Sequence, residues 1–403
     1  MCKKRVVITG AGCVSPYGEG RKILWQNLVQ GKSAIKQDAT FLASPLNVAV
    51  AAKVPPLDVK RIPRTYRRTM SPMSIYACLA AKEALDSANL TFLGDERLGV
   101  AIGSTMGSPE AMEEFFTTYF ATKSFDQIKS TLFFKTMSHT VAANVALYVG
   151  ATGRFLAPSA ACASALTAIG QGYEAIAFGQ EDLMLVGGAD EAHVLTAATF
   201  ERMGAASPNQ DPDLASRPFD LNRTGLVIGE GAGLLVLEEL EHAKIRKAPI
   251  LAEIIAFANQ TSPKSIAQPS KEDLLTCMAS ALKLAKLTPK DVSYINAHAT
   301  ATIQGDQAEG LAISELFGIK TPVSSLKGLL GHTLAASGAL ELMACLFMLQ
   351  NDHILKNYNL VEPDPNCGKV NLLLEDEHRP LTTILKNSFA LGGLYTSLII
   401  QKV

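Results

Sequence analysis

The sequence predicts an α/β protein built from two similar halves around a largely parallel β-sheet. First, short apolar runs rich in β-branched residues alternate with helical stretches along the 403-residue chain. Second, a glycine-containing turn followed by an apolar strand occurs at comparable places in the two halves, at 225–240 and 387–403. Third, two predicted helices of small, uncharged residues, at 162–173 and 328–340, also occupy comparable places.

The first half alternates predicted strands and helices in chain order. Strands at Val6–Thr9, Leu98–Ile102 and Leu183–Val186 are apolar runs, and each stops at a glycine. Helices at Ser74–Ala88 and Ser164–Phe178 lie between these strands. This alternation is typical of a sheet whose strands run in parallel.

The second half begins near residue 250, where Ile-Leu-Ala-Glu-Ile-Ile-Ala starts a new strand. We therefore expect an N-terminal half over 1–249 and a C-terminal half over 250–403, packed through helices that are apolar all round. The segment 155–173 carries no charge and has nearly the length of a membrane span. Because it is rich in Ala and Ser and has a proline near its start, a buried helix of a soluble core is the better interpretation.

Composition excludes several classes of protein. Apolar residues make up 48% and charged residues 19%, which excludes a disordered chain. The 37 basic and 38 acidic residues give a net charge of −1, so no overall attraction to nucleic acid or membranes is expected. Seven widely spaced cysteines without a CxxC pair argue against a disulfide framework and a zinc ribbon. The first apolar run is too short for a secretory signal, so we expect a soluble, cytoplasmic protein.

Cys162 stands at a predicted turn between a strand and a helix, in Pro-Ser-Ala-Ala-Cys-Ala-Ser-Ala. The positive end of a helix dipole favours a thiolate, and backbone N–H groups of the turn could receive an oxyanion. Cys162 is therefore a candidate nucleophile. The alternative is a small buried hydrophobic residue, as most single cysteines are. The other six cysteines lack this setting, and we interpret them as structural.

His298 and His332 are candidate partners of Cys162. His298 follows an apolar strand in Asn-Ala-His-Ala-Thr-Ala-Thr, and His332 follows a glycine at the entry to the second uncharged stretch. A lone histidine is usually structural, but two in such places favour nucleophilic catalysis with the cysteine. Alternatively, two neutral imidazoles would donate hydrogen bonds to a developing enolate oxygen. A zinc site is not predicted, since no HxxxH or HxxE spacing occurs.

Two further features suggest binding sites. Gly10-Ala11-Gly12 follows the first strand as a dinucleotide loop would, but Ser15 stands where GxGxxG requires its last glycine. A GxxxxGK[ST] loop is also absent from the sequence, so no nucleotide site is predicted. Residues 60–68 contain five basic residues and no acid. This stretch is either a solvated loop or a docking surface for an acidic partner.

With these residues in view, the sequence resembles the β-ketoacyl-acyl carrier protein synthases, in particular the elongating type II condensing enzymes. The resemblance runs essentially end to end. The motifs that carry it are VVITGAG, PSAACASAL, RPFDxxRxGLVIGEGAG (217–233), NAHATAT (296–302), SSLKGLLGHTLAASGALE (324–341) and NSFALGG (387–393). It implies a thiolase-like fold of two halves in five layers, αβαβα, in a homo- or heterodimer. The implied reaction is decarboxylative Claisen condensation of an acyl thioester with malonyl-acyl carrier protein, giving a 3-oxoacyl-acyl carrier protein in fatty acid elongation.

The resemblance also assigns roles. Cys162 would take the acyl group from the carrier protein's phosphopantetheine, while His298 and His332 would promote decarboxylation and stabilise the enolate. Lys327 would support His332 electrostatically. The remaining implied sites are an oxyanion hole of the Cys162 and Leu391 N–H groups, a pantetheine site at Thr300 and Thr302, and a carrier-protein patch at Arg64, Arg67 and Arg68. No metal or organic cofactor is implied, because loss of CO₂ drives carbon–carbon bond formation.

The sequence departs from the family pattern around the implied acyl channel. Ala299 stands where the family has Gly, and Leu391 and Leu226 each stand where it has Phe. Leu394-Tyr395 replaces the family's Thr-Asn, and the segment 259–269 lacks the family's Asp-x-x-His pattern. A ketosynthase of a specialised type II polyketide or polyene pathway is therefore the alternative function. A thiolase would carry a second catalytic cysteine near the C-terminus, and 387–393 has none. A non-catalytic chain-length-factor partner typically loses the nucleophile, whereas this chain retains it as Cys162.

Overall fold

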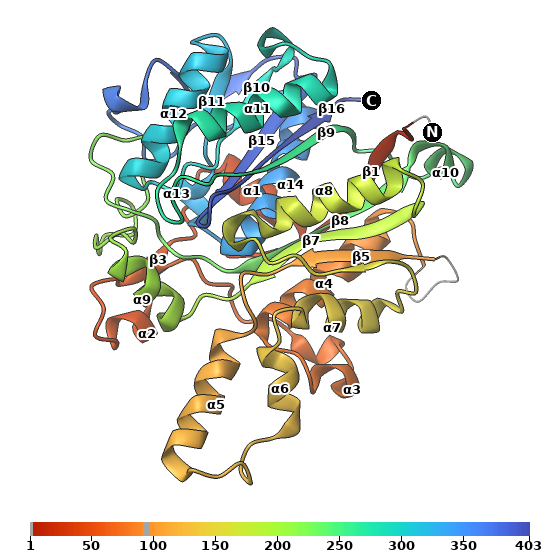
Figure 1. Cartoon of the computed structure of the whole chain (residues 1–403), viewed down its shortest axis with the longest axis vertical. Coiled ribbons are helices and arrows are strands. Elements are labelled where there is room, and N and C mark those ends of the chain that lie inside the picture. The colour runs from red at the N-terminus through yellow and green to blue at the C-terminus, as the bar shows by residue number, and fades with distance from the viewer. Residues whose placement is uncertain (1–2, 92–96) are drawn as a thin grey trace.

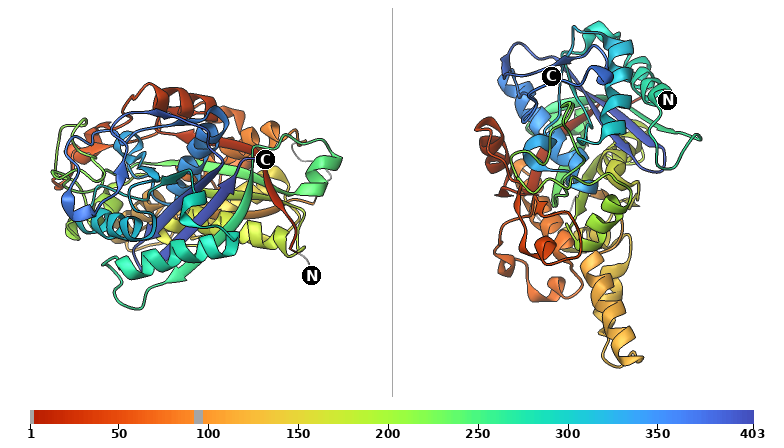
Figure 2. Two further views of the ribbon diagram at one scale, coloured as in Figure 1. Left: turned by 90° about the horizontal axis from the view of Figure 1, so that it is seen from above. Right: turned by 90° about the vertical axis from the view of Figure 1, so that its left-hand side faces the viewer.

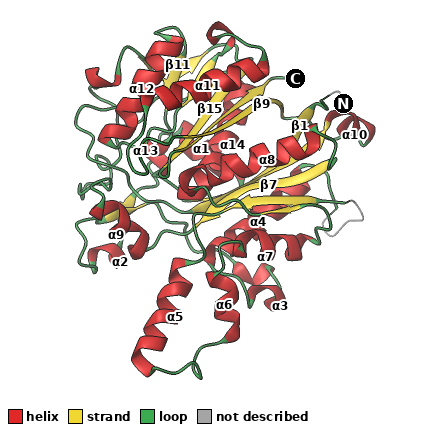
Figure 3. Cartoon of the chain, in the orientation of Figure 1, coloured by secondary structure: helices red, strands yellow, loops and turns green. Residues whose placement is uncertain are grey.

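The computed structural model describes residues 3–91 and 97–403, and these form five alternating layers of helices and strands (Figures 1 and 3). The helices of the three helical layers are, from one outer face to the other, α4 (Pro72–Ser87) and α7 (Thr140–Val149), then α8 (Ser164–Ala177) and α14 (Ser337–Asn351), then α11 (Lys271–Ala285) and α12 (Ile303–Phe317). The predicted five-layer α/β fold is confirmed.

The strands between these helices belong to one 12-stranded sheet. Those of the first half are, from the edge inward, β6 (Phe155–Leu156), β5 (Gly99–Gly103), β7 (Leu183–Asp190), β8 (Gly231–Glu239) and β1 (Val6–Ser15), with β2 (Gly18–Glu19) paired to β1. Those of the second half are, from the centre outward, β9 (Ala252–Thr261), β16 (Leu394–Gln401), β15 (Thr383–Ala390), β10 (Tyr294–Asn296), β11 (Pro322–Ser324) and β13 (Asn371–Leu372). Antiparallel pairing of β1 with β9 over Val6–Ile8 joins the two halves.

The internal duplication is visible in the strand pairing. In the first half β1, β8 and β7 pair antiparallel and β7, β5 and β6 pair parallel. In the second half β9, β16 and β15 pair antiparallel and β15, β10 and β11 pair parallel, in the same order. The strands β8 and β16 are therefore equivalent, and they come from the segments 225–240 and 387–403, whose similarity predicted the duplication. The expected largely parallel sheet is wrong, because these strands make the sheet mixed.

Helices α8 and α14 form the middle layer, and each packs against strands of both half-sheets. Twelve residues of each helix are buried, which explains why both sequences are apolar all round. The helix expected within 155–173 starts only at Ser164, because Phe155–Leu156 is a strand. The helix expected over 328–340 is interrupted, because a short helix ends at Leu330 and α14 begins only at Ser337. Leu334–Asn351 is long and apolar enough to cross a membrane, but 83% of it is buried inside the protein, as in a core helix.

The glycines of the first strand serve packing. The strand was expected to stop at Thr9, yet β1 continues through Gly10 and Gly12 to Ser15 with a register shift after Ile8. A Cβ at Gly10 would lie 2.3 Å from the Ala84 carbonyl oxygen of α4, and one at Gly12 would lie 2.2 Å from that of Ala80. Glycine is required here so that α4 can approach the strand closely.

Several smaller elements lie outside the layers. The short helices are α1 (Arg21–Val29), α2 (Ala39–Leu42), α3 (Arg64–Arg67), α9 (Val194–Arg202), α10 (Leu240–Ile245) and α13 (Lys327–Leu330). Two small antiparallel sheets pair β3 (Lys36–Gln37) with β4 (Val50–Ala51) and β12 (His353–Ile354) with β14 (Glu377–His378). Helices α5 (Pro109–Thr122) and α6 (Ser130–Thr136) form an arm that projects from the body in Figure 1 and in the right panel of Figure 2.

The connection between α10, which ends at Ile245, and β9, which begins at Ala252, leads from the first half to the second. We propose the division into 1–249 and 250–403 at this connection. Limited proteolysis tests it: this connection should be cut before the helices of the middle layer.

Candidate active site

Cys162 lies in a short 3₁₀ turn, Ala161–Ala163, directly before α8. Ala161 has a left-handed backbone with φ of 46°, which is strained for a residue with a Cβ. The Ser164 hydroxyl holds this turn by accepting from the Ala160 N–H at 2.9 Å and donating to the Ala161 carbonyl at 2.7 Å. The turn therefore fixes the direction in which the thiol points.

The thiolate expected from the helix N-terminus is wrong. Burial raises the pKa of the Cys162 thiol to about 12, although Lys327 opposes this shift. Desolvation outweighs the favourable field because a thiolate loses its hydration shell in the interior. The group is therefore a neutral thiol near pH 7, and it needs a neighbouring base to act as a nucleophile.

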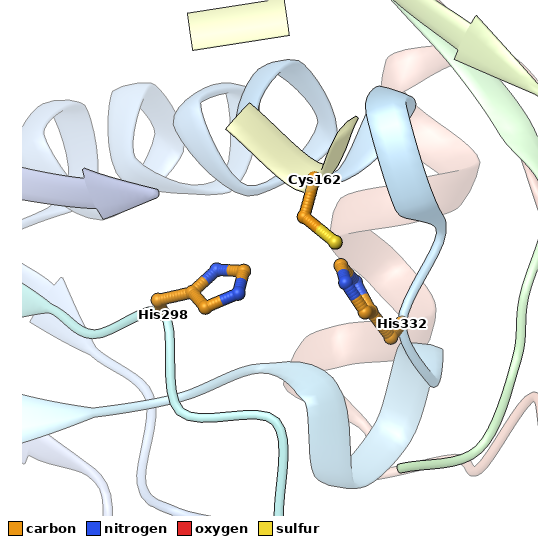
Figure 4. Close-up of side chains that lie close together, drawn as sticks. All are labelled: Cys162, His298 and His332. Carbon is orange, nitrogen blue, oxygen red and sulfur yellow. The ribbon is translucent and has the colours of Figure 1, made fainter. Parts of the chain in front are cut away.

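Two imidazoles from the second half lie beside this thiol, as Figure 4 shows. The Cys162 Sγ atom and one ring nitrogen each of His298 and His332 lie within 4.8 Å of one another. The two rings meet edge to face with centroids 5.3 Å apart. The structure thus brings together three residues that are up to 170 positions apart in the sequence, one from the first half and two from the second.

His298 is positioned by the carboxylate of Glu309 on α12. One Glu309 oxygen accepts the backbone N–H of His298 at 2.9 Å, and the other accepts that of Ala299 at 2.8 Å. The Asn387 side chain donates a third hydrogen bond to Glu309 at 3.0 Å. With donors on both oxygens, the carboxylate acts as an acceptor only, which fits its ionised form.

His332 is positioned by the GLVIGEG segment of the first half. Its backbone N–H donates to the Val227 carbonyl at 2.7 Å, and its carbonyl accepts from the Gly229 N–H at 2.8 Å. This short parallel bridge ties the segment before β8 to the segment after α13. The 225–233 motif therefore contributes to the site by fixing a histidine of the other half.

Both imidazoles are neutral. Burial, with Lys327 next, holds the pKa of His298 and of His332 well below the usual range. Among the described residues, His298 Nδ1 and both ring nitrogens of His332 have no hydrogen-bond partner. A buried nitrogen without a partner is costly unless a ligand completes it, so these atoms are available to a substrate.

A fully buried ionic cluster lies beside the histidines. The Lys327 ammonium pairs with Glu341 Oε1 at 2.5 Å, and the Lys386 ammonium pairs with Glu341 Oε2 at 2.5 Å. Burial lowers the pKa of Lys327, whereas Glu341 raises it. Lys327 and Lys386 both lower the pKa of His332, and both pair with Glu341.

A cavity of about 490 Å³ leads to the thiol and the two imidazoles. Its lining includes Cys162, His298, His332, Thr300, Thr302, Leu226 and Leu391. The hydroxyl oxygens of Thr300 and Thr302 lie 3.0 Å apart, so the pair presents a polar edge to the cavity. Leu391 packs in one apolar cluster with Leu226, and the preceding Ala390 packs against Cys162. The two leucines that replace the family's phenylalanines therefore belong to one apolar cluster at the cavity wall.

The basic stretch lies apart from the cavity. Arg64 and Arg67 bound α3, which follows a turn in which Arg61 pairs with Glu19. Arg64 and Arg68 are exposed, but Arg67 is half-buried and donates to the Ile62 carbonyl at 2.8 Å. Arg67 thus has a local structural partner, and the surface available to a binding partner is smaller than expected.

Sequence reasoning missed Glu309, Glu341 and Lys386. Each is a single charged residue in a segment whose neighbours are mostly apolar or small, and each is buried. An isolated charge in a stretch predicted to be buried was the available signal, since charged residues are rarely buried unless paired.

A cysteine and two histidines are also residue types that bind zinc. Two buried ammonium groups close to these ligands would repel a divalent cation, so the arrangement suits acyl transfer better than metal binding. The other described cysteines are buried and lie outside the cavity lining, and Cys2 lies outside the described residues.

The five layers, the internal duplication and the site between the two halves are those of a thiolase-like fold. The chain matches the models of the beta-ketoacyl synthase N-terminal domain over residues 3–243 and C-terminal domain over 251–361. It therefore belongs to the β-ketoacyl synthase family.

Named relatives support this assignment. The chain is 34% identical over 406 residues to 3-oxoacyl-[acyl-carrier-protein] synthase 1 of Escherichia coli (strain K12), with 99% of each chain covered. A beta-ketoacyl synthase crystal structure from Burkholderia phymatum STM815 superposes with a TM-score of 0.95 at 40% identity, covering 99% of this chain and 100% of that one. A type II PKS ketosynthase solved with its acyl-carrier protein and bound to the hexaketide gives 0.90 at 32%, covering 100% of both chains.

Proposed function

We propose that the protein catalyses decarboxylative Claisen condensation of an acyl thioester with malonyl-acyl carrier protein, giving a 3-oxoacyl-acyl carrier protein. The observation that carries this proposal is the convergence of Cys162, His298 and His332 along one cavity in a chain of this family. A neutral thiol beside two neutral imidazoles suits transfer of an acyl group followed by stabilisation of an enolate.

In the first step the Cys162 sulfur attacks the carbonyl carbon of the acyl-carrier thioester. Its proton passes to a neighbouring imidazole, and the carrier thiolate leaves and takes up that proton. The backbone N–H groups of Cys162 and Leu391 stabilise the oxyanion, a role supported by the packing of Ala390, beside Leu391, against Cys162. The product is an acyl group joined to Cys162 as a thioester.

In the second step malonyl-carrier protein loses its carboxylate as CO₂. The electron pair of the broken C–C bond forms an enolate, whose oxygen accepts hydrogen bonds from His298 and His332. The enolate carbon then attacks the acyl carbon on Cys162, the C–S bond breaks, and the thiolate takes up a proton from water, because its first proton left with the carrier thiol. Neutral imidazoles suit this step because a neutral ring donates one N–H without trapping the enolate as a protonated enol.

The cavity suits a pantetheine arm that ends at the cluster. Thr300 and Thr302 offer hydroxyl groups along its wall, and we assign them to amide groups of the arm. The exposed Arg64 and Arg68, with the half-buried Arg67, would contact the acidic carrier protein. Changing Arg64 and Arg68 together to Glu should raise KM for carrier-bound substrate, with the effect reduced at high salt and no change in KM for a small thioester.

We further propose a dimer in the cytoplasm. The arm of α5 and α6 exposes aromatic side chains at Phe116, Phe120, Phe125, Phe133 and Phe134, and an exposed apolar patch of this kind is typical of an interface. A second copy of the chain is the occupant that the family resemblance implies. Light scattering should give twice the chain mass for the full protein and a smaller mass after Phe116→Ser with Phe120→Ser. A monomer before any change would contradict the proposal.

We assign the protein to fatty acid elongation, with a specialised polyketide or polyene pathway as the alternative. The observation that favours the alternative is the pair of leucines at 226 and 391, which replaces the family's aromatic residues at these two positions, although Phe200, Phe389 and Tyr395 line the cavity elsewhere. A chain-length-factor role is disfavoured by the intact cluster of Cys162 and two histidines.

The test is a product assay with purified protein, acyl-carrier protein and ¹³C-labelled malonyl-carrier protein. Mass spectrometry should detect a 3-oxoacyl-carrier product together with released CO₂. Saturated straight-chain acyl groups should react fastest if the protein serves fatty acid elongation, and unsaturated or aromatic ones if it serves the alternative. Release of neither CO₂ nor product from any acyl donor would contradict the proposed reaction.

A further inference from the structure

Lys386 lies in the middle of β15, and its side chain has no exposure to solvent. Its ammonium contacts Glu341 Oε2 at 2.5 Å and donates to the Asn387 carbonyl at 2.5 Å. Burying an ammonium costs several kcal/mol unless charged or polar partners compensate. A lysine in a central strand therefore needs a reason beyond packing, and the steps of the proposed reaction do not use it.

The charged groups that face Lys386 come from three other elements. Lys327 belongs to α13, Glu341 to α14 and Glu309 to α12. Glu309 is already saturated by donors at His298 and Ala299 and by Asn387. The triad of Lys327, Glu341 and Lys386 carries two positive charges and one negative charge, so it has one net positive charge. With the ionised Glu309 included, the charges of the four buried groups balance.

The neighbouring titratable groups that remain are uncharged. Burial raises the pKa of the Cys345 thiol on α14 to about 12, and it raises the pKa of Tyr294 on β10. The balance of the buried cluster therefore depends on the two lysines and the two glutamates.

We propose that Lys386 is a positioning residue for condensation, which holds the second oxygen of Glu341 and supplies a positive charge that, together with that of Lys327, keeps His298 and His332 unprotonated. With Lys386 in place, Glu341 is held at both oxygens and Lys327 keeps its position. Without Lys386 the triad would have no net charge and the four buried groups would have a net negative one. Glu341 Oε2, which has no hydrogen-bond partner among the described residues, would also lose its ion pair. The inference rests on the proposed function, because neutral imidazoles matter only if they act on an enolate.

The lowered pKa of both histidines agrees with this role. Lys386 contributes to the lowering at each ring, after burial and Lys327. At the Cys162 thiol the favourable charge is that of Lys327. Loss of Lys386 should therefore affect decarboxylation more than acylation.

The experiment compares charge with hydrogen bonding. Lys386→Met removes both, Lys386→Gln keeps a donor without the charge, and Lys386→Arg keeps the charge. The double variant Lys386→Met with Glu341→Gln restores one net positive charge. Lys402→Met is the matched control, since Lys402 is an exposed lysine near the end of the adjacent strand, paired with Asp352. Each protein is assayed for malonyl decarboxylation from about pH 5 to pH 8, and its histidine rings are titrated by NMR.

The Met and Gln variants should shift the acid limb of the decarboxylation profile, and the titration of at least one histidine, upward by about one pH unit. The Arg variant, the double variant and Lys402→Met should keep the original profile. Lys386→Gln with an unchanged profile and titration would overturn the proposal, as would a double variant that behaves like Lys386→Met.

The NMR titration separates this inference from the proposed function. If the wild type does not decarboxylate malonyl-carrier protein, the proposed function fails, while the charge effect of Lys386 on the two rings is still measured. If Lys386→Met does not fold, the Gln and Arg variants still decide between charge and hydrogen bonding.

Discussion

Replacing Glu309 by glutamine tests how the position of His298 is maintained. In the structure one oxygen of Glu309 accepts the His298 N–H at 2.9 Å and the other accepts the Ala299 N–H at 2.8 Å. The amide of glutamine has one accepting oxygen and one donating nitrogen, so one of these two N–H groups would face another donor. A buried backbone N–H left without an acceptor costs about 1–3 kcal/mol.

We therefore expect Glu309→Gln to lower the free energy of unfolding by about 1–3 kcal/mol in urea denaturation. If the same energy is lost in holding His298 at the enolate, malonyl decarboxylation should fall by about 10- to 100-fold. Acylation of Cys162 should fall less, because His332 is held independently by Val227 and Gly229. Glu315→Gln, an exposed position on the same helix that pairs with Lys271, is the matched control.

The reasoning would be refuted if Glu309→Gln were as stable and as active as Glu315→Gln. A loss of stability without any loss of decarboxylation would show that Glu309 supports the fold but not the position of His298.

Three further predictions follow from the cavity and the buried groups. Leu391→Phe should narrow the range of acyl chains that the protein accepts, because the phenyl ring occupies more of the cavity than the leucine side chain, but the shortest acyl group should still load onto Cys162. Unchanged relative loading rates of the acyl chains would show that Leu391 does not select among them. Cys162 should be alkylated by iodoacetamide before the other cysteines, and its rate should rise about tenfold per pH unit from about pH 7 to 9, since the thiol pKa is about 12; a plateau below pH 8 would contradict this. Because the pKa of His332 is lowered by folding, the unfolded chain takes up its proton first as the pH falls below about 6.5. The wild type should therefore lose stability relative to His332→Gln by up to about 1.4 kcal/mol per pH unit below that value, and a pH-independent difference in urea unfolding would contradict the lowered pKa.

The alternation of strands and helices predicted the fold class and the duplication, because both can be recognised from local sequence patterns. The segments that precede β8 and β16 are similar in sequence, and they occupy equivalent places in the sheet. The direction in which a strand pairs with a distant strand is not written locally, and this is why the antiparallel pairs were missed. The Gly10-Ala11-Gly12 segment was expected as a turn for a related reason, since the close approach of α4 that requires glycine is a tertiary contact.

The candidate site was predictable only in part. Cys162, His298 and His332 each stand in a distinctive local context, and the family resemblance joined them. The charge state of Cys162 was predicted wrongly, because the field of a helix N-terminus can be anticipated from sequence but the depth of burial cannot. Glu309 and Lys386 act through partners far away in the chain, at His298 and Glu341, so their local sequences did not reveal their place in the site.

The role of Cys162 as the acyl-accepting nucleophile is tested most directly by the intact mass of the protein after incubation with a series of acyl-carrier proteins. The mass should rise by one acyl group, and peptide mapping should place this group on Cys162. The Cys162→Ala variant should stay unmodified while still decarboxylating malonyl-carrier protein. An acyl group on another residue, or equal loading of Cys162→Ala, would contradict this role.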